Sequence, residues 1–444
     1  MKIYCYPLVL IISLFVFPAS GQSSVKRPEN ALEQQIELAR LEINKRFIDP
    51  KFGILLDYAG KNGENSLPTP EECRDDKPNG LNWWAPMENG AFFNGIYLDG
   101  LCNRWKVTTK KADELEARKV ARGLVKLATI GSVPGFISRD VASDGKSHHV
   151  SGSDDQTGPW FYGMWRYVKS GIPDQEEKEK LVRLMVTVGS ALEARNWQLP
   201  CDREGYGFRG NLTDKGCRIA VRLLFIYRAL YDVTNDQKWL DGYHRRLLEV
   251  PEGDSLNRLE LCARGIPYET THPEKGNITE NHFWITGISQ ANLKALVEME
   301  QSVELREKFR QGLNITAKKA ALHLSQYKNF DNQHDKAFTE NWRLLNPLWK
   351  PQPNISATLK LALQQVREWD KLSPARGYED KYMREPLFAC WVVLLSGNKT
   401  LIHEHESVLR NALMHYDWKQ LHTSRFFVVV PAYYEAIMNG TLQR

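Results

Sequence analysis

Residues Phe283 to Met299 read FWITGISQANLKALVEM, and apolar side chains return along this stretch at three- and four-residue spacing. That spacing is typical of one face of an α-helix. It recurs almost from end to end of the chain, without a convincing run of alternating apolar and polar residues. The sequence therefore predicts an all-α fold of about a dozen helices. The predicted helices cover Ala31–Ile48, Asn89–Val107, Ala112–Ile130, Pro159–Val168, Glu177–Trp197, Cys217–Tyr231, Trp239–Val250, Phe283–Met299, Leu305–Tyr327, Ala357–Trp369, Pro386–Leu395, Val408–Trp418 and Phe426–Met438.

The segments between these helices carry residues that break helices, such as Gly171 with Pro173 and the glycine-rich stretch Gly205–Gly210. Helices of this length joined by such loops form hairpins. A succession of hairpins can close into an α/α toroid whose open face carries the loops. No low-complexity tail or long linker divides the sequence. We therefore expect one α/α-toroid catalytic domain over residues 22–444.

Residues 1–21 have the pattern of a cleavable signal peptide. Lys2 is followed by the apolar run Leu8–Pro18 and then by the small residues Ala19, Ser20 and Gly21. No later segment offers about 20 uninterrupted apolar residues, so a membrane span is not expected. The sequence predicts a secreted or periplasmic protein.

Six cysteines remain after residue 21, an even number that permits disulfides in an exported protein. Cys201 and Cys217 bracket the glycine-rich loop and are the expected pair. No CxxC spacing occurs, and neither His148-His149 nor His403-x-His405 comes with a pattern that fixes a third ligand. The sequence therefore predicts no metal site, and it implies no organic cofactor.

The composition favours a carbohydrate ligand. The chain has 13 Trp and 17 Tyr, more than a core requires, and surplus aromatic residues in exported proteins often stack on sugar rings. The net charge of +5 slightly favours an anionic ligand, but no Lys/Arg cluster interleaved with aromatic residues indicates nucleic acid. A serine-hydrolase GxSxG motif and a Walker loop are both absent. Enzymes that cleave glycans remain.

The run Glu280-Asn281-His282-Phe283-Trp284 places an amide and an imidazole side by side at the start of a predicted helix. A base next to an amide donor suits removal of a proton beside a sugar carboxylate. The alternative is a helix N-cap followed by a core histidine.

Further junctions gather polar residues before aromatic helices. In Trp83–Gly95, Glu88 and Asn89 are candidate substrate-binding residues and Trp84 is a stacking floor. In Ser151–Tyr167, Asp155 and Gln156 precede Trp160, and more polar groups converge than helix capping requires. Arg139 suits a bidentate contact with a carboxylate, as does Arg376 in a later loop. Arg425, before the apolar run Phe426–Val430, is expected at the surface.

The run Asn281-His282-Phe283-Trp284 on a helical background resembles the Asn-His-x-(Tyr/Trp) signature of α/α-toroid polysaccharide lyases that cleave alginate, glucuronan and ulvan. The resemblance implies that Asn281 neutralises the substrate carboxylate and His282 is the base, with Trp284 beside them in the substrate site. The lyases add a later Tyr and Arg. Tyr378 with Arg376 fits that order, whereas Tyr162 with Arg139 fits the aromatic context, so the acid stays open. Cleavage of a uronate-containing, anionic polysaccharide by β-elimination is then expected.

A second resemblance leads to a different chemistry. Ser153-Asp154-Asp155-Gln156-Thr157 before an aromatic helix is similar to junctions in six-hairpin toroid glycosidases that act on glucuronyl or unsaturated uronyl residues. It implies that Asp154 or Asp155 protonates the bond, with Glu88 or Glu280 as the second carboxylate. A non-catalytic glycan-binding protein is a third possibility, in which the tryptophans serve as platforms and the acids have no role.

Overall fold

The computed structural model describes residues 31–266 and 283–442. Over these residues the fold is all-α, as predicted, with two short strands. The α-helices are α1 Ala31–Glu42, α2 Pro70–Arg74, α3 Gly90–Thr108, α4 Lys111–Thr129, α5 Asp154–Val168, α6 Gln175–Ala194, α7 Cys217–Thr234, α8 Gln237–Leu248, α9 Arg258–Ala263, α10 Phe283–Met299, α11 Val303–Ala321, α12 Ile355–Leu372, α13 Pro374–Glu379, α14 Glu385–Leu395, α15 Lys399–Met414 and α16 Val429–Met438. Short 3₁₀ or π segments are η1 Ile43–Phe47, η2 Leu324–Asn329, η3 Trp342–Leu348, η4 Asp380–Arg384 and η5 Arg425–Val428.

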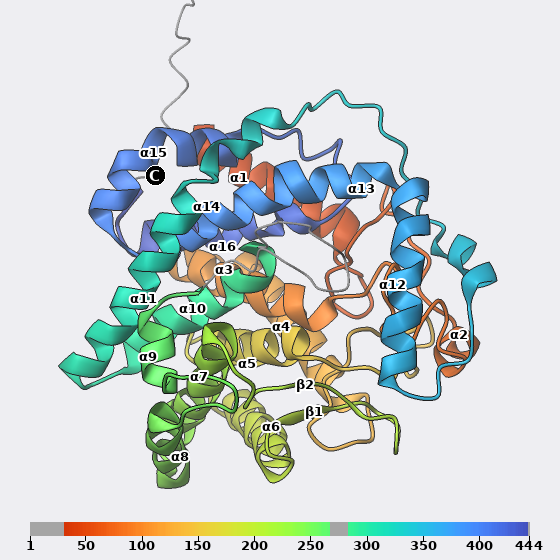
Figure 1. Cartoon of the computed structure of the whole chain (residues 1–444). Helices are drawn as coiled ribbons and strands as arrows, with labels where there is room; N and C mark the ends of the chain where they lie inside the picture. The colour runs from red at the N-terminus through yellow and green to blue at the C-terminus, as the bar shows by residue number, and fades with distance from the viewer. Residues whose placement is uncertain (1–30, 267–282, 443–444) are drawn as a thin grey trace, which may run out of the picture.

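Six of these helices, which we call the inner helices, are buried along most of their length: α3, α5, α7, α10, α14 and α16. They contact one another in a closed order, since α3 contacts α5, α5 contacts α7, α7 contacts α10, α10 contacts α14, α14 contacts α16 and α16 contacts α3. Figure 1 shows α14, α16, α3 and α5 across the middle of the molecule. One continuous cluster of buried apolar side chains joins them.

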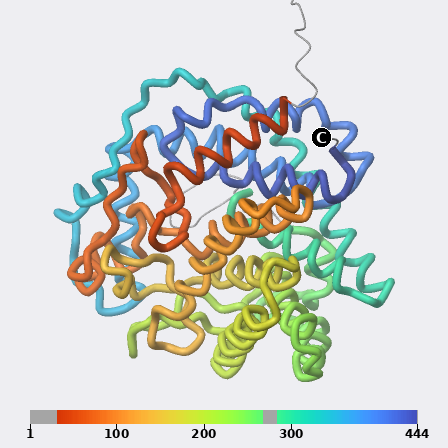
Figure 2. Tube along the Cα trace, turned by 180° about the vertical axis from the view of Figure 1, so that it is seen from behind, coloured from red at the N-terminus to blue at the C-terminus, as the bar shows by residue number. Residues whose placement is uncertain are grey.

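The other long helices pack on the outside of the inner helices. α4 contacts α3 and α5, α6 contacts α5 and α7, and α11 contacts α10 and α14. α8 packs on α7, and α15 packs on α14. α1 lies against α15 and α16, so the N-terminal and C-terminal parts of the described chain meet, as seen from behind in Figure 2.

Sequence explains which helices lie inside. Every residue of α14, EPLFACWVVLL, is buried, whereas α4 buries one face and carries lysines, arginines and acids on the other. The close crossing of α3 and α5 requires glycine. A Cβ on Gly95 would lie 2.1 Å from the Pro159 carbonyl oxygen, and one on Gly163 would lie 2.6 Å from the Gly95 Cα. Larger residues at either position would push the two helices apart.

Each predicted helical segment overlaps an observed helix, but several boundaries differ. α5 begins at Asp154 rather than Pro159, and α15 begins at Lys399 rather than Val408. The short helices α2, α9 and α13 were not predicted. The glycine-rich stretch forms part of the turn and the start of β2 in an antiparallel hairpin, in which β1 Gln198–Pro200 pairs with β2 Phe208–Asn211.

A long insertion between α11 and α14 holds η2, η3, α12, α13 and η4. Trp342, Leu345 and Trp369 of this insertion pack with Tyr58 and Ala85 in a second apolar cluster. Trp84 packs against this cluster. This packing fixes α12 beside the loop of residues 75–89. It thereby carries Arg376, on α13, to the start of α3.

The predicted Cys201–Cys217 disulfide is wrong. Cys73, Cys102, Cys201, Cys217, Cys262 and Cys390 are all free and buried in the structure. The predicted signal peptide lies outside the described residues. None of the described helices is long and apolar enough to span a membrane.

Candidate functional site

The starts of the inner helices α3, α5, α7, α10 and α14 and of η5 meet at one end of the molecule, which we call the mouth. The backbone N–H of Phe283 donates to the Glu385 carboxylate at 2.6 Å, which joins α10 to α14. Arg222 on α7 donates to the Asp154 carboxylate at 2.7 Å and to the Ile285 carbonyl oxygen at 2.9 Å, which joins α7 to α5 and α10. Helix starts expose backbone N–H groups and favour negative charge. Acids therefore gather here.

Arg139 connects the starts of α3 and α5. Its guanidinium donates to the Glu88 carbonyl oxygen at 3.0 Å, to the Ser153 hydroxyl at 2.7 Å and to the Asn89 side-chain oxygen at 3.1 Å. The same group lies 3.4 Å from an Asp155 carboxylate oxygen. Arg139 is 2% exposed, so it holds the site together from within.

Asp155 is the carboxylate that Arg139 contacts, and 16% of its side chain is exposed. Burial favours its neutral form, but the Arg139 charge and a hydrogen bond from Ser153 outweigh burial and lower the pKa of Asp155. Asp155 is therefore ionised at neutral pH. An ionised carboxylate that keeps contact with solvent is suited to act as a base.

Two further carboxylates, Asp57 and Glu88, lie next to each other before the start of α3. The backbone N–H groups of Glu88 and Asn89 both donate to Asp57, at 3.0 and 2.9 Å. The Asn89 amide donates to Asp57 at 2.7 Å and to Glu88 at 3.2 Å, so it bridges the two acids. Burial and then the charge of Glu88 raise the pKa of Asp57 to about 7. The pair thus holds a proton near neutral pH.

Two arginines from distant segments face this pair of acids. Arg376 donates to Glu88 at 2.6 Å, and its guanidinium lies 5.0 Å above the Trp84 ring. Its Nη1 atom is buried without a hydrogen-bond partner among the described residues. Arg425 lies 3.7 Å from Asp57 and 3.6 Å from Glu88. Arg425 is 4% exposed, so the expected surface position is wrong.

Trp284 and its neighbours form the opposite side of the mouth. The Trp284 ring is partly exposed and packs edge-on against Phe92 of α3, with ring centroids 5.3 Å apart. The Arg384 guanidinium lies 4.8 Å above the same ring. Trp84, which packs under Arg376, is also partly exposed.

Some predicted residues lie elsewhere. Trp160 is fully buried and donates to the Leu124 carbonyl oxygen at 3.0 Å, so it belongs to the core and not to a stacking platform. Gln156 is also fully buried, and its side-chain oxygen accepts from the backbone N–H groups of Ala91 and Phe92. It therefore caps α3 and does not face a substrate.

The two tyrosines proposed as acids are separated by the fold. Tyr162 lies eight residues into α5, about 12 Å along the helix from its start. Its hydroxyl donates to the buried Asp99 at 2.9 Å, away from Arg139. Tyr378 is two residues from Arg376, is partly exposed, and donates to the Asn329 carbonyl oxygen at 3.1 Å. Its hydroxyl also accepts from the backbone N–H of Asp331 at 2.7 Å, so in this structure it is bonded to the segment after η2.

The Asn281-His282 pair and Glu280 lie outside the described residues. Their predicted roles stay predictions. The start of α10 lies at the mouth, because the backbone N–H of its first residue, Phe283, donates to Glu385.

Asp57 had no signal in the sequence, because it follows the apolar run Ile54-Leu55-Leu56 and precedes no predicted helix. Its position comes from a single antiparallel bridge between Tyr58 and Thr423. The backbone N–H of Ser424 also donates to the Asp57 carbonyl oxygen at 3.0 Å. These contacts bring together residues more than 360 positions apart.

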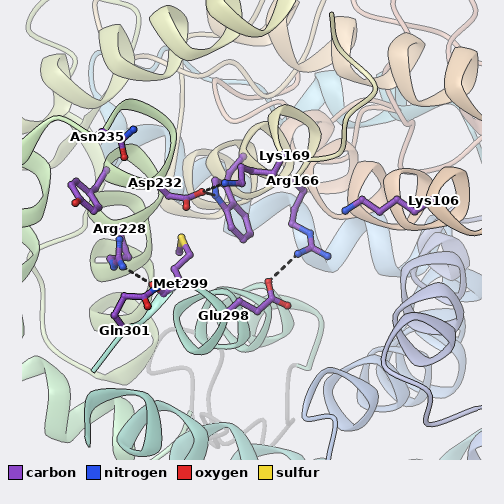
Figure 3. Close-up of a pocket in the computed structure, with 11 residues that line it drawn as sticks. Lys106, Arg166, Lys169, Arg228, Asp232, Asn235, Glu298, Met299 and Gln301 are labelled. Carbon is purple, nitrogen blue, oxygen red and sulfur yellow. Dashed lines mark hydrogen bonds and ion pairs between the residues drawn. The ribbon is translucent and has the colours of Figure 1, made fainter. Parts of the chain in front are cut away.

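The hollow in Figure 3 lies at the other end of the inner helices, near the ends of α3, α5, α7 and α10. It encloses about 520 Å³. Both of its acids pair with basic residues: Arg166 lies 3.1 Å from Glu298, and Lys169 lies 3.1 Å from Asp232. We therefore place the candidate active site at the mouth. No protein-family model matches this chain, and no curated protein matches it.

Proposed function

We propose that this protein is a carbohydrate-active enzyme with an α/α-toroid fold that cleaves a uronate-containing, anionic glycan at the mouth. The reaction that its described residues support best is hydrolysis of a glycosidic bond. The observation that carries this proposal is the meeting of Asp155 with the Asp57–Glu88 pair through Arg139 and Asn89.

Glycoside hydrolysis requires one carboxyl group that gives a proton and one carboxylate that activates water or attacks the sugar. The lowered pKa of Asp155 fits the carboxylate that acts as base or nucleophile. The raised pKa of Asp57 keeps a proton on the Asp57–Glu88 pair. Asp57 is fully buried and the Asn89 amide bridges it to Glu88, so we assign the proton donor to the pair as a whole.

The groups around the acids suit a charged sugar. Arg376 has a buried Nη1 atom without a partner among the described residues, and this atom offers a donor to a sugar carboxylate. Trp84 and Trp284 are partly exposed, and they are the candidates for stacking on a sugar ring. A uronate bound between them would place its carboxylate near Arg376 and its glycosidic bond near Glu88 and Asp155.

β-Elimination is the second candidate. It is favoured by the start of α10 at the mouth, because Phe283 follows the Asn281-His282 pair directly in the sequence. In that reaction His282 removes the proton next to the carboxylate, Asn281 holds the developing charge, and Tyr378 is the remaining candidate acid. In that reaction Arg139 only positions Asn89 and Ser153 and does not contact the substrate.

The two reactions give different products, so a panel of alginate, glucuronan and ulvan chains and oligosaccharides separates them. Hydrolysis should release new reducing ends without a rise in ultraviolet absorbance from an unsaturated uronate. Elimination should release reducing ends together with that absorbance, and His282→Ala should then abolish it. Tight binding without any new reducing end on all of these glycans would contradict both reactions and leave a binding protein.

A further inference from the structure

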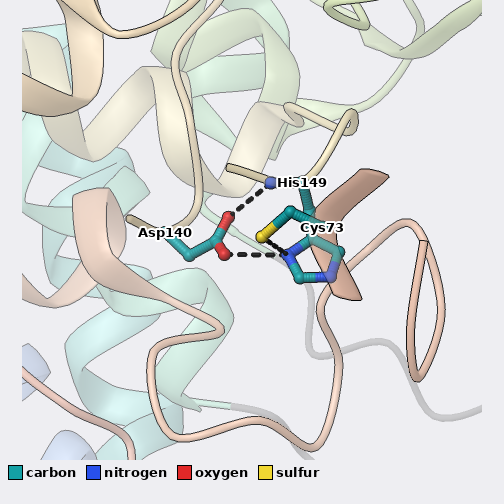
Figure 4. Close-up of side chains that lie close together, drawn as sticks. All are labelled: Cys73, Asp140 and His149. Carbon is teal, nitrogen blue, oxygen red and sulfur yellow. Dashed lines mark hydrogen bonds and ion pairs between the residues drawn. The ribbon is translucent and has the colours of Figure 1, made fainter. Parts of the chain in front are cut away.

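Three buried side chains outside the mouth converge on one point. Cys73 comes from α2, whereas Asp140 and His149 come from the loop between α4 and α5. Their ligand atoms all lie within 4.8 Å of one another, and each residue is at most 3% exposed. Figure 4 shows the Cys73 sulfur and an Asp140 oxygen both directed at the same ring nitrogen of His149.

The distances fit a metal-ligand set. The Cys73 Sγ lies 3.6 Å from the His149 Nδ1, and an Asp140 oxygen lies 2.8 Å from it. Tetrahedral Zn²⁺ with ordinary bond lengths separates a sulfur and a nitrogen ligand by about 3.5 Å, and a nitrogen and an oxygen ligand by about 3.4 Å. The distance from the sulfur to Nδ1 therefore already matches, and the carboxylate oxygen needs to move away from Nδ1 by about half an ångström.

The atoms that would not bind a metal are already occupied. The second ring nitrogen of His149, Nε2, lies 2.8 Å from the Lys77 carbonyl oxygen. The second oxygen of Asp140 accepts from the backbone N–H of His149 at 3.0 Å. Histidine ligands of metals usually donate their other ring N–H to a carbonyl or carboxylate, which fixes the tautomer. Here that bond leaves Nδ1 turned toward the sulfur and the carboxylate.

Hydrogen bonding alone satisfies this cluster less well. A proton on Nδ1 serves the Asp140 carboxylate at 2.8 Å, so the thiol of Cys73 faces a nitrogen that has no lone pair to offer. A divalent cation instead contacts all three groups. With a thiolate, a carboxylate and a neutral imidazole it gives a net charge of zero, which suits a fully buried position.

We propose that Cys73, Asp140 and His149 bind a Zn²⁺ ion, with water as the fourth ligand. Thiolate and imidazole select Zn²⁺ over Mg²⁺ and Ca²⁺, which require oxygen ligands. Binding displaces two protons to solvent, one from the thiol and one shared by the imidazole and the carboxylate. The proposal is independent of the proposed glycan chemistry.

The position of this site gives the ion a structural role. Asp140 follows Arg139 directly, and His149 is four residues from Ser153, a hydrogen-bond partner of Arg139. Cys73 begins the segment that leads to Trp84 and Glu88. A metal here therefore ties together the two loops that hold the mouth.

The test is the metal content of the whole chain, purified after expression with added zinc and dialysed in metal-free buffer. Inductively coupled plasma mass spectrometry should find about one equivalent of zinc per chain. A protein loaded with Co²⁺ instead should show a thiolate-to-cobalt charge-transfer band. Removal of zinc with dipicolinate should lower the melting temperature, and added zinc should restore it. Less than about a tenth of an equivalent, with no cobalt band and no change of melting temperature, would overturn the proposal.

Matched variants localise the ion. Cys73→Ser and Asp140→Asn should each lose the zinc and the band, whereas Cys201→Ser, which alters an equally buried thiol elsewhere, should keep both. Retention of the cobalt band in Cys73→Ser would show that another sulfur binds the metal. If Cys73→Ser fails to fold, the metal content and cobalt spectrum of the unaltered chain still decide the proposal.

Discussion

The two ends of the inner helices both bury charged side chains, but they do so differently. At the far end, near the hollow in Figure 3, acids pair with basic residues from neighbouring helices: Asp99 lies 2.5 Å from Arg166, and Arg166 lies 3.1 Å from Glu298. At the mouth, Asp57 and Glu88 share one amide donor. Removing one partner of a buried ion pair is strongly destabilising, whereas groups with perturbed pKa values cluster at functional sites.

Asp155→Asn should have the largest effect on activity and thereby sharpen this contrast. The variant keeps the shape of the side chain but removes the ionised carboxylate that Arg139 stabilises. Loss of a group that acts as base or acid lowers kcat by about 100-fold or more. The measurement is the release of reducing ends from whichever glycan of the panel the parent cleaves.

Glu298→Gln is the matched control, because it also removes a carboxylate bonded to arginine, but at the far end. Its activity should equal that of the parent. Equal urea midpoints for parent and Asp155→Asn would show that the loss is chemical. Activity above about a third of the parent in Asp155→Asn would remove Asp155 from the reaction.

Asp99→Asn should have the largest effect on stability. Asp99 is fully buried, accepts from Tyr162 at 2.9 Å and from Arg166 at 2.5 Å, and lies far from the mouth. Breaking a buried ion pair costs about 3–5 kcal/mol, and the remaining contact of Arg166 with Glu298 favours the lower value. Urea unfolding measures the loss. Activity per folded molecule should stay unchanged, and a large fall in kcat would show that the far end takes part in the chemistry.

The helices could be predicted because their signal is local. Apolar residues at helical spacing located every inner helix within a few residues, except α5. There the polar run Asp154–Thr157 hid the first turn, since acids suit a helix start but carry no apolar period. The short hairpin β1–β2 escaped because three or four residues show no period. The free cysteines show the same limit, because spacing in sequence does not report distance.

The site could be predicted only in part. The sequence singled out Glu88, Asn89, Asp155, Arg139 and Arg376 as candidates because polar residues beside aromatic ones suit a sugar site. The structure brings all five together, and their roles in a reaction stay predictions. Asp57 escaped, because its role depends on contacts with residues near Thr423. The cluster of Cys73, Asp140 and His149 was not predicted either, because Cys73 is distant in sequence and the spacing of Asp140 and His149 within one loop matches no metal-binding motif. Tyr162 and Trp160 were misplaced, because an aromatic residue in a helix near polar groups has the same pattern in a core and at a surface.

Asp57→Asn should change how stability depends on pH. Burial and Glu88 raise the pKa of Asp57 from 3.8 to about 7, so the folded state holds a proton that the unfolded chain releases. This contribution to stability is fully present below about pH 4 and is lost as the pH rises to about 7. The difference in free energy of unfolding, parent minus variant, should therefore fall across this range.

The measurement is urea unfolding of both proteins at several pH values between about 4 and 8. Glu379, whose pKa burial also raises to about 7, and His422, whose pKa burial lowers to about 4, are present in both proteins and cancel in the difference. A difference that rises with pH would mean that the arginines at the mouth keep Asp57 ionised. The acids at the mouth would then be ionised and paired with arginines, as they are at the far end. The proton for the leaving oxygen would have to come from a group other than the Asp57–Glu88 pair.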